Sequence, residues 1–118
     1  MTAPLAGIRV LEVANWLAAP AAGALMADLG ADVIKIEPPG GEAFRGYRMT
    51  SMGYTHEFET NYAFECDNRG KRSMTVALDR PGGPELVRRL SEKVDVFLTN
   101  LIQPRCVRYG LTYEEVRA

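Results

Sequence analysis

Four short apolar runs, separated by helical patterns, constrain the fold of this chain more than any other feature. The runs are Gly7–Ala14, Ala31–Glu37, Ser73–Leu78 and Val94–Asn100. Between the first two, apolar residues recur at the spacing of one helical face, namely at Ala22, Leu25, Met26 and Leu29. Strand, helix and strand in this order predict a βαβ unit, with parallel strands and a right-handed crossover.

The rest of the pattern extends this unit. Helices are expected over Pro84–Lys93, with Asp79 as a candidate N-cap, and from Pro104 to Gly110. Thr112–Glu115 matches a capping box, which predicts a further helix start. Strands that alternate with helices predict an α/β fold, a Rossmann-like parallel sheet with helices on both faces. The 118 residues suffice for a single domain.

The segment Pro38–Gly70 has no clear periodicity and is predicted to be a long irregular loop. Loops of this length are commonly functional or packed against something else. Its aromatic side chains need a covering surface, which we expect to come from outside this chain. These residues are Phe44, Tyr47, Tyr54, Phe58, Tyr62 and Phe64.

Composition excludes several classes of partner. The net charge of −1 provides no overall basic field for nucleic acid or an anionic membrane. No apolar stretch is long enough to cross a bilayer, so we expect a cytoplasmic protein. Two cysteines, Cys66 and Cys106, and the single His56 have no metal-type spacing, and no metal site is expected.

Three cations lie within four positions just before the third strand: Arg69, Lys71 and Arg72. Two interpretations are open. Glu65 and Asp67 are close in sequence and could neutralise a solvated turn. Alternatively, guanidinium groups and a lysine form an anion site, for which phosphate is the obvious ligand.

In open parallel sheets, ligands bind beyond the carboxyl ends of the strands. Three turns meet that description here: Asn15–Pro20, Pro38–Gly41 and Asn100–Pro104. The first lacks the glycines of a G-x-G-x-x-G fingerprint, which disfavours pyrophosphate packing in the Rossmann manner. The helix that begins near Ala18 still offers unpaired N–H groups and the positive end of its dipole.

Three side chains near these turns have both a structural and a functional interpretation. Trp16 either belongs to the core or lines a pocket. Asn100 either hydrogen-bonds a ligand or caps the next turn. Arg108 either favours a helix C-terminus or reaches a phosphate. Acidic residues such as Glu12 and Glu37 form no triad or paired-carboxylate set, so no catalytic residue is assigned.

Three blocks of this sequence together resemble the family III CoA-transferases, the group of formyl-CoA transferase, carnitine CoA-transferase and α-methylacyl-CoA racemase. "PLAGIRVLEVANWLAAPAAGALMADLGADVIKIEPPGG" is similar to the family's N-terminus, with Ala19 where glycine is usual. "DNRGKRSMTVAL" resembles its N-R-x-K-R-S-L-x-L-D segment. "VDVFLTNLIQPRCVRYGLTYEEVRA" resembles its A-D-V-x-x-x-N-F-x-P-G-x-x-x-R-L-G-L segment.

The resemblance implies that coenzyme A or acyl-CoA is a substrate, with no permanently bound cofactor. Carried over by position, the CoA contacts are Leu17, Ala18, Val76, Asn100, Leu101, Ile102 and Arg108. Because CoA carries a pyrophosphate and a ribose phosphate, the resemblance also favours the anion interpretation for Lys71 and Arg72. Departures from the family pattern are Pro38 for a basic residue, Leu101 for phenylalanine, Arg105 for glycine and Asp79 for lysine.

The resemblance further implies covalent carboxylate catalysis, in which an aspartate attacks the acyl-CoA thioester and an aspartyl-CoA intermediate passes CoA to a second carboxylic acid. By the family pattern that aspartate lies beyond Ala118. Family members are longer and form interlocked homodimers, so the chain is expected to be an N-terminal CoA-binding segment. Two other activities stay open, a 2-methylacyl-CoA racemase and a non-catalytic module that binds CoA or another nucleotide.

Overall fold

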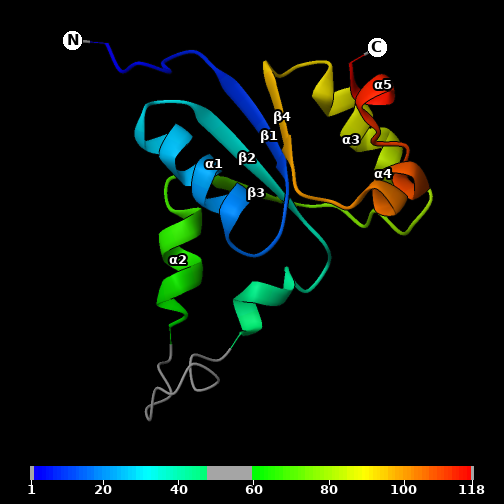
Figure 1. Cartoon of the computed structure of the whole chain (residues 1–118), viewed down its shortest axis with the longest axis horizontal. Helices are drawn as coiled ribbons and strands as arrows, with labels where there is room; N and C mark the ends of the chain where they lie inside the picture. The colour runs from blue at the N-terminus through cyan, green and yellow to red at the C-terminus, as the bar shows by residue number, and fades with distance from the viewer. Residues whose placement is uncertain (1, 48–59, 118) are drawn as a thin grey trace.

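The computed structural model describes residues 2–47 and 60–117 and confirms the predicted α/β fold (Figure 1). One parallel sheet has the strand order β3-β2-β1-β4. Its strands are β1 Arg9–Val13, β2 Asp32–Glu37, β3 Arg72–Thr75 and β4 Val96–Thr99. β1 therefore lies between β2 and β4, so its backbone is paired on both sides.

Helices cover both faces of this sheet, as predicted. Figure 1 shows α1 and α2 on one side and α3, α4 and α5 on the other. Their bounds are α1 Ala18–Asp28, α2 Tyr62–Asn68, α3 Gly83–Ser91, α4 Gln103–Tyr109 and α5 Tyr113–Val116, with a 3₁₀ helix at Ala43–Gly46. None of the helices in these described ranges has the length and apolarity that a membrane crossing requires.

Two apolar clusters fill the space between the sheet and the helices. The larger one lies under α3 and α5 and is built on Leu11, Val13, Ile36, Val76, Val87 and Leu111. The smaller one lies under α1 and consists of Val10, Ala31 and Val33, with Met26 packed against it. Adjacent residues of β1 thus enter opposite clusters, as the pleat of a strand requires.

The predicted apolar face of α1 is wrong in part, since Met26 packs against the smaller cluster but the other three residues of that face are exposed. Leu25 and Leu29 are 57% and 46% exposed, whereas Pro20, Gly23 and Ala24 are buried. Small residues face the sheet because a large ionic side chain lies there: a Cβ at Gly23 would collide with Glu12 Oε2. The helix buries its smallest side chains and leaves two leucines toward solvent.

The prediction of an irregular loop over Pro38–Gly70 is also wrong in part. It contains the 3₁₀ helix and α2, while its residues 48–59 lie outside the described ranges. Asn61 caps α2, because its Oδ1 accepts a hydrogen bond from Phe64 N at 3.0 Å. Phe44 and Phe64 are buried within this chain, so these two aromatic residues need no outside surface.

Helix ends follow the predicted chemistry with one exception. Gly30 and Gly110 have φ values of 99° and 59°, which suit glycine after a helix. The capping box is confirmed, since Thr112 N and Oγ1 donate to Glu115 Oε2 at 3.0 and 2.7 Å. The first helical residue of α3 is Gly83 and its N-cap is Gly82, not Asp79.

Candidate ligand site at the carboxyl edge of the sheet

A small cleft of about 100 Å³ opens where β1, β2 and β3 end. It lies on the face covered by α3 and α4, because its walls continue the larger apolar cluster. Residues from four strand ends and from α4 line it, including Val13, Asn15, Pro38, Val76, Leu101 and Tyr109. The structure thus brings two predicted site residues, Val76 and Leu101, into one cleft. Val76 is itself only 5% exposed.

Asn100 holds the turn between β1 and α1. Its Oδ1 accepts a hydrogen bond from Asn15 N at 3.0 Å, and its Nδ2 donates to Asn15 O at 2.7 Å. This pair of bonds satisfies both backbone groups of Asn15 with a single amide side chain. Of the two interpretations open for Asn100, the structure shows the structural one, in which its side chain holds a turn. Its neighbours Asn15 and Leu101 both line the cleft.

Leu17 and Ala18 occupy the start of α1, directly beyond the carboxyl end of β1. Both are exposed, and Leu17 makes no side-chain capping bond. No acidic residue lies in the first turn. The N–H groups of this helix start, together with the dipole of an 11-residue helix, therefore attract an anion.

Arg108 and Ile102 are the sequence neighbours of two residues that line the cleft, Tyr109 and Leu101. Ile102 is the N-cap of α4 and is 65% exposed. The Arg108 guanidinium lies 5.8 Å from the ring centroid of Tyr109, which lines the cleft. Within residues 2–47 and 60–117, no carboxylate lies at ion-pair distance from Arg108.

The cation cluster before β3 has carboxylate partners, but not the two expected ones. Arg69 Nη2 lies 2.5 Å from Asp28 Oδ2, and Arg72 Nη2 lies 2.6 Å from Asp32 Oδ2. Residues distant in sequence, rather than Glu65 and Asp67, neutralise these charges. Because Arg72 begins β3, it lies at the amino end of the sheet, away from the cleft.

Lys71 belongs to a buried ionic network that sequence reasoning missed. Its Nζ lies 2.8 Å from Glu12 Oε2 and donates to Pro20 O at 2.8 Å. Lys35 Nζ donates to Glu12 Oε1 at 2.9 Å and lies 3.1 Å from Glu42 Oε2. All four ionic side chains are at most 3% exposed. Burial lowers the pKa of Lys71 and raises that of Glu42, while the adjacent opposite charges act against both shifts.

A signal for this network was present in the sequence. Glu12 and Lys35 are opposite each other in the register of β1 and β2, at the fourth position of each strand. Opposite charges at matching positions in two adjacent buried strands indicate a pair across the ladder. Glu42, in contrast, belongs to the segment that was predicted to be irregular.

Glu37 forms a second ionic contact at the carboxyl end of β2. Arg45 Nε and Nη2 donate to its two oxygens at 2.6 and 2.7 Å, and Ser73 Oγ donates at 3.1 Å. The hydrogen bonds from Arg45 lower the pKa of Glu37 to about 2, against the opposing effect of burial. Glu37 is therefore a carboxylate at neutral pH that fixes the segment after β2, and not a proton donor.

The Trp16 ring packs on other aromatic rings. Its ring centroid is 5.7 Å from that of Phe44 and 6.0 Å from that of Tyr47. Phe44 in turn packs against Phe64 of α2 at 6.4 Å. Trp16 is 47% exposed, so the structural interpretation of a core residue does not hold.

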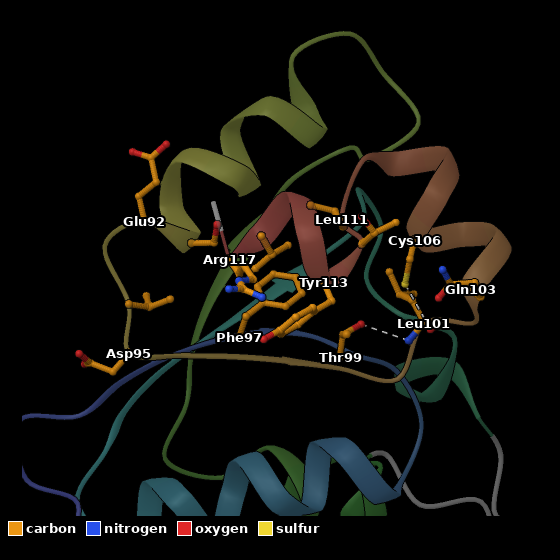
Figure 2. Close-up of a pocket in the computed structure, with 14 residues that line it drawn as sticks. Glu92, Asp95, Phe97, Thr99, Leu101, Gln103, Cys106, Leu111, Tyr113 and Arg117 are labelled. Carbon is orange, nitrogen blue, oxygen red and sulfur yellow. Dashed lines mark hydrogen bonds between the residues drawn. The ribbon is translucent and has the colours of Figure 1, made fainter.

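A larger cleft of about 720 Å³ lies beside β4 and has a different character. Figure 2 shows Phe97 and Tyr113 in its centre, between β4 and the helices α4 and α5. Leu101 is the one predicted site residue in its lining. The basic residue in that lining is Arg117, whose guanidinium lies 5.4 Å from the Tyr113 ring centroid. This cleft does not present the features of a phosphate site.

The family model of CoA-transferase family III matches residues 5–118. The chain belongs to CoA-transferase family III. It is 43% identical over 116 residues to succinate–glutarate CoA-transferase of Agrobacterium fabrum, covering 97% of this chain and 29% of that protein. It is 37% identical to cinnamoyl-CoA:phenyllactate CoA-transferase of Clostridium sporogenes, covering 94% of this chain and 27% of that protein.

Solved structures of family members have the same fold over this length. A CAIB/BAIF family protein of Brucella suis superposes with a TM-score of 0.85 at 38% identity, covering 99% of this chain and 31% of that one. Rv3272 of Mycobacterium tuberculosis superposes with a TM-score of 0.86 at 35% identity, covering 98% and 31%. The chain therefore spans about three-tenths of the length of these relatives.

Proposed function

We propose that this chain is the CoA-binding N-terminal segment of an acyl-CoA transferase that moves CoA between carboxylic acids. The observation that carries the proposal is the convergence at one edge of the sheet. The start of α1, the cleft beside Val76 and Leu101, and the end of α4 with Arg108, which has no ion-pair partner among the described residues, all follow the carboxyl ends of strands. A family III protein that offers these groups together has a place for the nucleotide part of CoA.

The chemistry of the edge suits that ligand. The pyrophosphate needs positive charge, which the Arg108 guanidinium supplies, while the N–H groups of Leu17 and Ala18 at the start of α1 are donors for carbonyl oxygens of the pantetheine arm. The apolar walls of the cleft, with Val76 and Leu101, suit the uncharged parts of the molecule. Asn100 and Ile102 complete the proposed contact set at the end of β4. The resemblance also predicted contacts from Lys71 and Arg72, but because carboxylates already pair with both, we propose that the phosphates lie at the carboxyl edge and not at these two residues.

The named relatives support a transferase. Their names describe transfer of CoA between succinate and glutarate, between cinnamoyl-CoA and phenyllactate, and between succinyl-CoA and D-citramalate. The first name pairs two carboxylic acids, and the other two each pair a CoA thioester with a free carboxylic acid. By this likeness we propose the same reaction class here, through an aspartyl-CoA intermediate on an aspartate that this chain does not contain.

We also propose that the complete protein is an interlocked homodimer. The exposed leucines of α1, Leu25 and Leu29, are apolar surface that assembly would cover. Sedimentation of the complete protein tests this, because a monomer at micromolar concentration would contradict it.

The reaction itself is tested by incubating the complete protein with a panel of acyl-CoAs and isotopically labelled free acids. Mass spectrometry then follows the appearance of new thioesters. Transfer of CoA to a free acid, together with a transient adduct of CoA mass on the protein, supports the proposal. Interconversion of 2-methylacyl-CoA stereoisomers without transfer would indicate a racemase instead. Binding of CoA with no reaction at all would leave a binding module.

A further inference from the structure

We infer that Trp16 contacts the acyl group of the bound thioester and that the site favours bulky apolar acyl groups over short ones with a second carboxylate. This inference rests on the proposed function. It concerns the acyl end of the substrate rather than its nucleotide end. Three observations carry it: the backbone conformation of Trp16, the packing of its ring, and the charges around it.

The backbone of Trp16 is held in an unfavourable conformation. Its φ of 65° is the one positive value among the non-glycine residues that the structure describes. A bulky side chain is rare in this region, and such strain clusters at functional sites. The two hydrogen bonds between Asn100 and Asn15 hold the preceding residue, so Asn100 acts as the positioning residue for the indole ring.

The ring is fixed on one side and open on the other. Phe44, which is 3% exposed, packs against the Trp16 ring, and Tyr47 contacts that ring edge-on with an interplanar angle of 77°. Phe44 and Tyr47 also contact each other at 5.8 Å between centroids. With 47% of its surface exposed, Trp16 presents a rigid apolar surface to whatever lies beyond the end of β1.

The exposed ring of Trp16 and the cleft both lie at the carboxyl edge of the sheet, but on opposite faces of it. The cleft continues the apolar cluster under α3, whereas Phe44 packs on Phe64 of α2, on the opposite face. Asn15 lines the cleft and directly precedes Trp16. A thioester whose phosphates lie at Arg108 and whose pantetheine arm follows the apolar cleft therefore passes Asn15 and brings its acyl end onto the indole ring.

The charges nearest the aromatic surface are already neutralised. Arg45 pairs with both oxygens of Glu37, and Lys35 pairs with Glu12 and Glu42. Among the described residues around Trp16, a second carboxylate on the acyl group would meet no unpaired cation. A flat or branched apolar group, in contrast, would cover exposed indole and gain contact area.

Selectivity in the complete protein tests this inference. The ratio of kcat/KM for 3-phenylpropanoyl-CoA to that for succinyl-CoA is measured with one acceptor acid, in wild type and in Trp16→Leu. We expect wild type to prefer the aromatic thioester and the ratio to fall at least tenfold in the variant. Trp16→Phe should retain most of the preference. Tyr113→Leu, which removes a 71% exposed aromatic ring on α5, is the matched control and should leave the ratio unchanged.

The outcomes separate the inference from the proposed function. Transfer with an unchanged ratio in Trp16→Leu would overturn the inference alone. An equal loss of affinity for free CoA and for the aromatic thioester would also overturn it, because Trp16 would then contact the nucleotide. No transfer with any pair of substrates would overturn the proposed function itself, and the inference with it.

The positioning role of Asn100 has its own readout. Asn100→Ala should lower the same ratio, and the double variant with Trp16→Leu should show no further loss of selectivity. Asn100→Asp keeps the acceptor for Asn15 N but loses the donor for Asn15 O, so an intermediate ratio is expected. Independent, multiplicative losses in the double variant would show that Asn100 does not act through Trp16.

Discussion

On the face of the sheet covered by α1 and α2, β1 presents Glu12 and β2 presents Lys35, both buried. On the opposite face, the same two strands present Leu11, Val13 and Ile36 to an apolar cluster. The apolar face needs only size and shape to pack well. The ionic face needs each partner in place, because an unpaired buried charge is costly.

The difference teaches how the segment after β2 is fixed. Glu42 and Arg45 belong to that segment, and each reaches back to a residue of the sheet, Lys35 or Glu37. Such pairs add little net stability, since desolvation offsets their attraction. They do specify one position for the backbone that carries Phe44 and Tyr47. The apolar face contributes stability, and the ionic face contributes geometry to the site.

The largest effect should come from removing the centre of the network. Lys35→Met leaves Glu42 buried without its cation and leaves Glu12 with Lys71 alone, and we expect it to lower the free energy of unfolding by about 3–5 kcal/mol. Urea unfolding at pH 7 measures this. A loss below about 1 kcal/mol would show that the network is unimportant for the fold.

On the ionic face, Gly23→Ala should have the next largest effect, with a sign opposite to that expected from helix propensity. Alanine in an open helix position gains about 1 kcal/mol over glycine, but here the added Cβ would collide with Glu12 Oε2. We expect a net loss of about 1–3 kcal/mol in urea unfolding. Ala22→Gly, at an exposed position of the same helix, is the control and should cost about 1 kcal/mol for propensity alone. A stabilised Gly23→Ala variant would contradict the tight contact.

The ionic face should also make stability depend on pH. The folded-state pKa of Glu37 is about 2, below its ordinary value of 4.5. Its contribution is therefore present above pH 4.5 and lost as the pH falls toward 2. Glu37→Gln should cost about 1–2 kcal/mol at pH 7 and progressively less below pH 4.5. Leu11→Ala on the apolar face should cost about 2–5 kcal/mol with little dependence on pH. If the loss of unfolding free energy depended on pH equally in both variants, the ionic and apolar faces would not differ in their pH dependence.

The smallest effect should come from an ion pair at the surface. Arg72 and Asp32 are 64% and 48% exposed, so solvent screens their attraction. Arg72→Ala should change the free energy of unfolding by less than about 1 kcal/mol, and 0.5 M salt should abolish the difference. A larger loss would place Arg72 with the buried network rather than with the solvated pairs.

The sequence was sufficient to predict the fold class and the four strands, and a cleft opens at the carboxyl edge where the sequence predicted a ligand site. Hydrophobic periodicity predicts the strands and the fold class, and the rule that ligands bind at the carboxyl ends of parallel strands predicts the edge. It was insufficient for the buried face of α1, because Leu25 and Leu29 follow helical periodicity but Gly23 must face Glu12. Three-dimensional proximity, not local pattern, decides which carboxylate neutralises Arg69 or Lys71.

The central claim is that the carboxyl edge, and not the cation cluster before β3, holds the phosphates of CoA. The most direct test is the dissociation constant of CoA for the complete protein, measured by calorimetry in wild type, Arg108→Ala and Arg72→Ala. The account predicts that Arg108→Ala weakens binding at least tenfold, while Arg72→Ala stays within about twofold of wild type. The reverse order, with Arg72→Ala the weaker binder and Arg108→Ala unchanged, would contradict it.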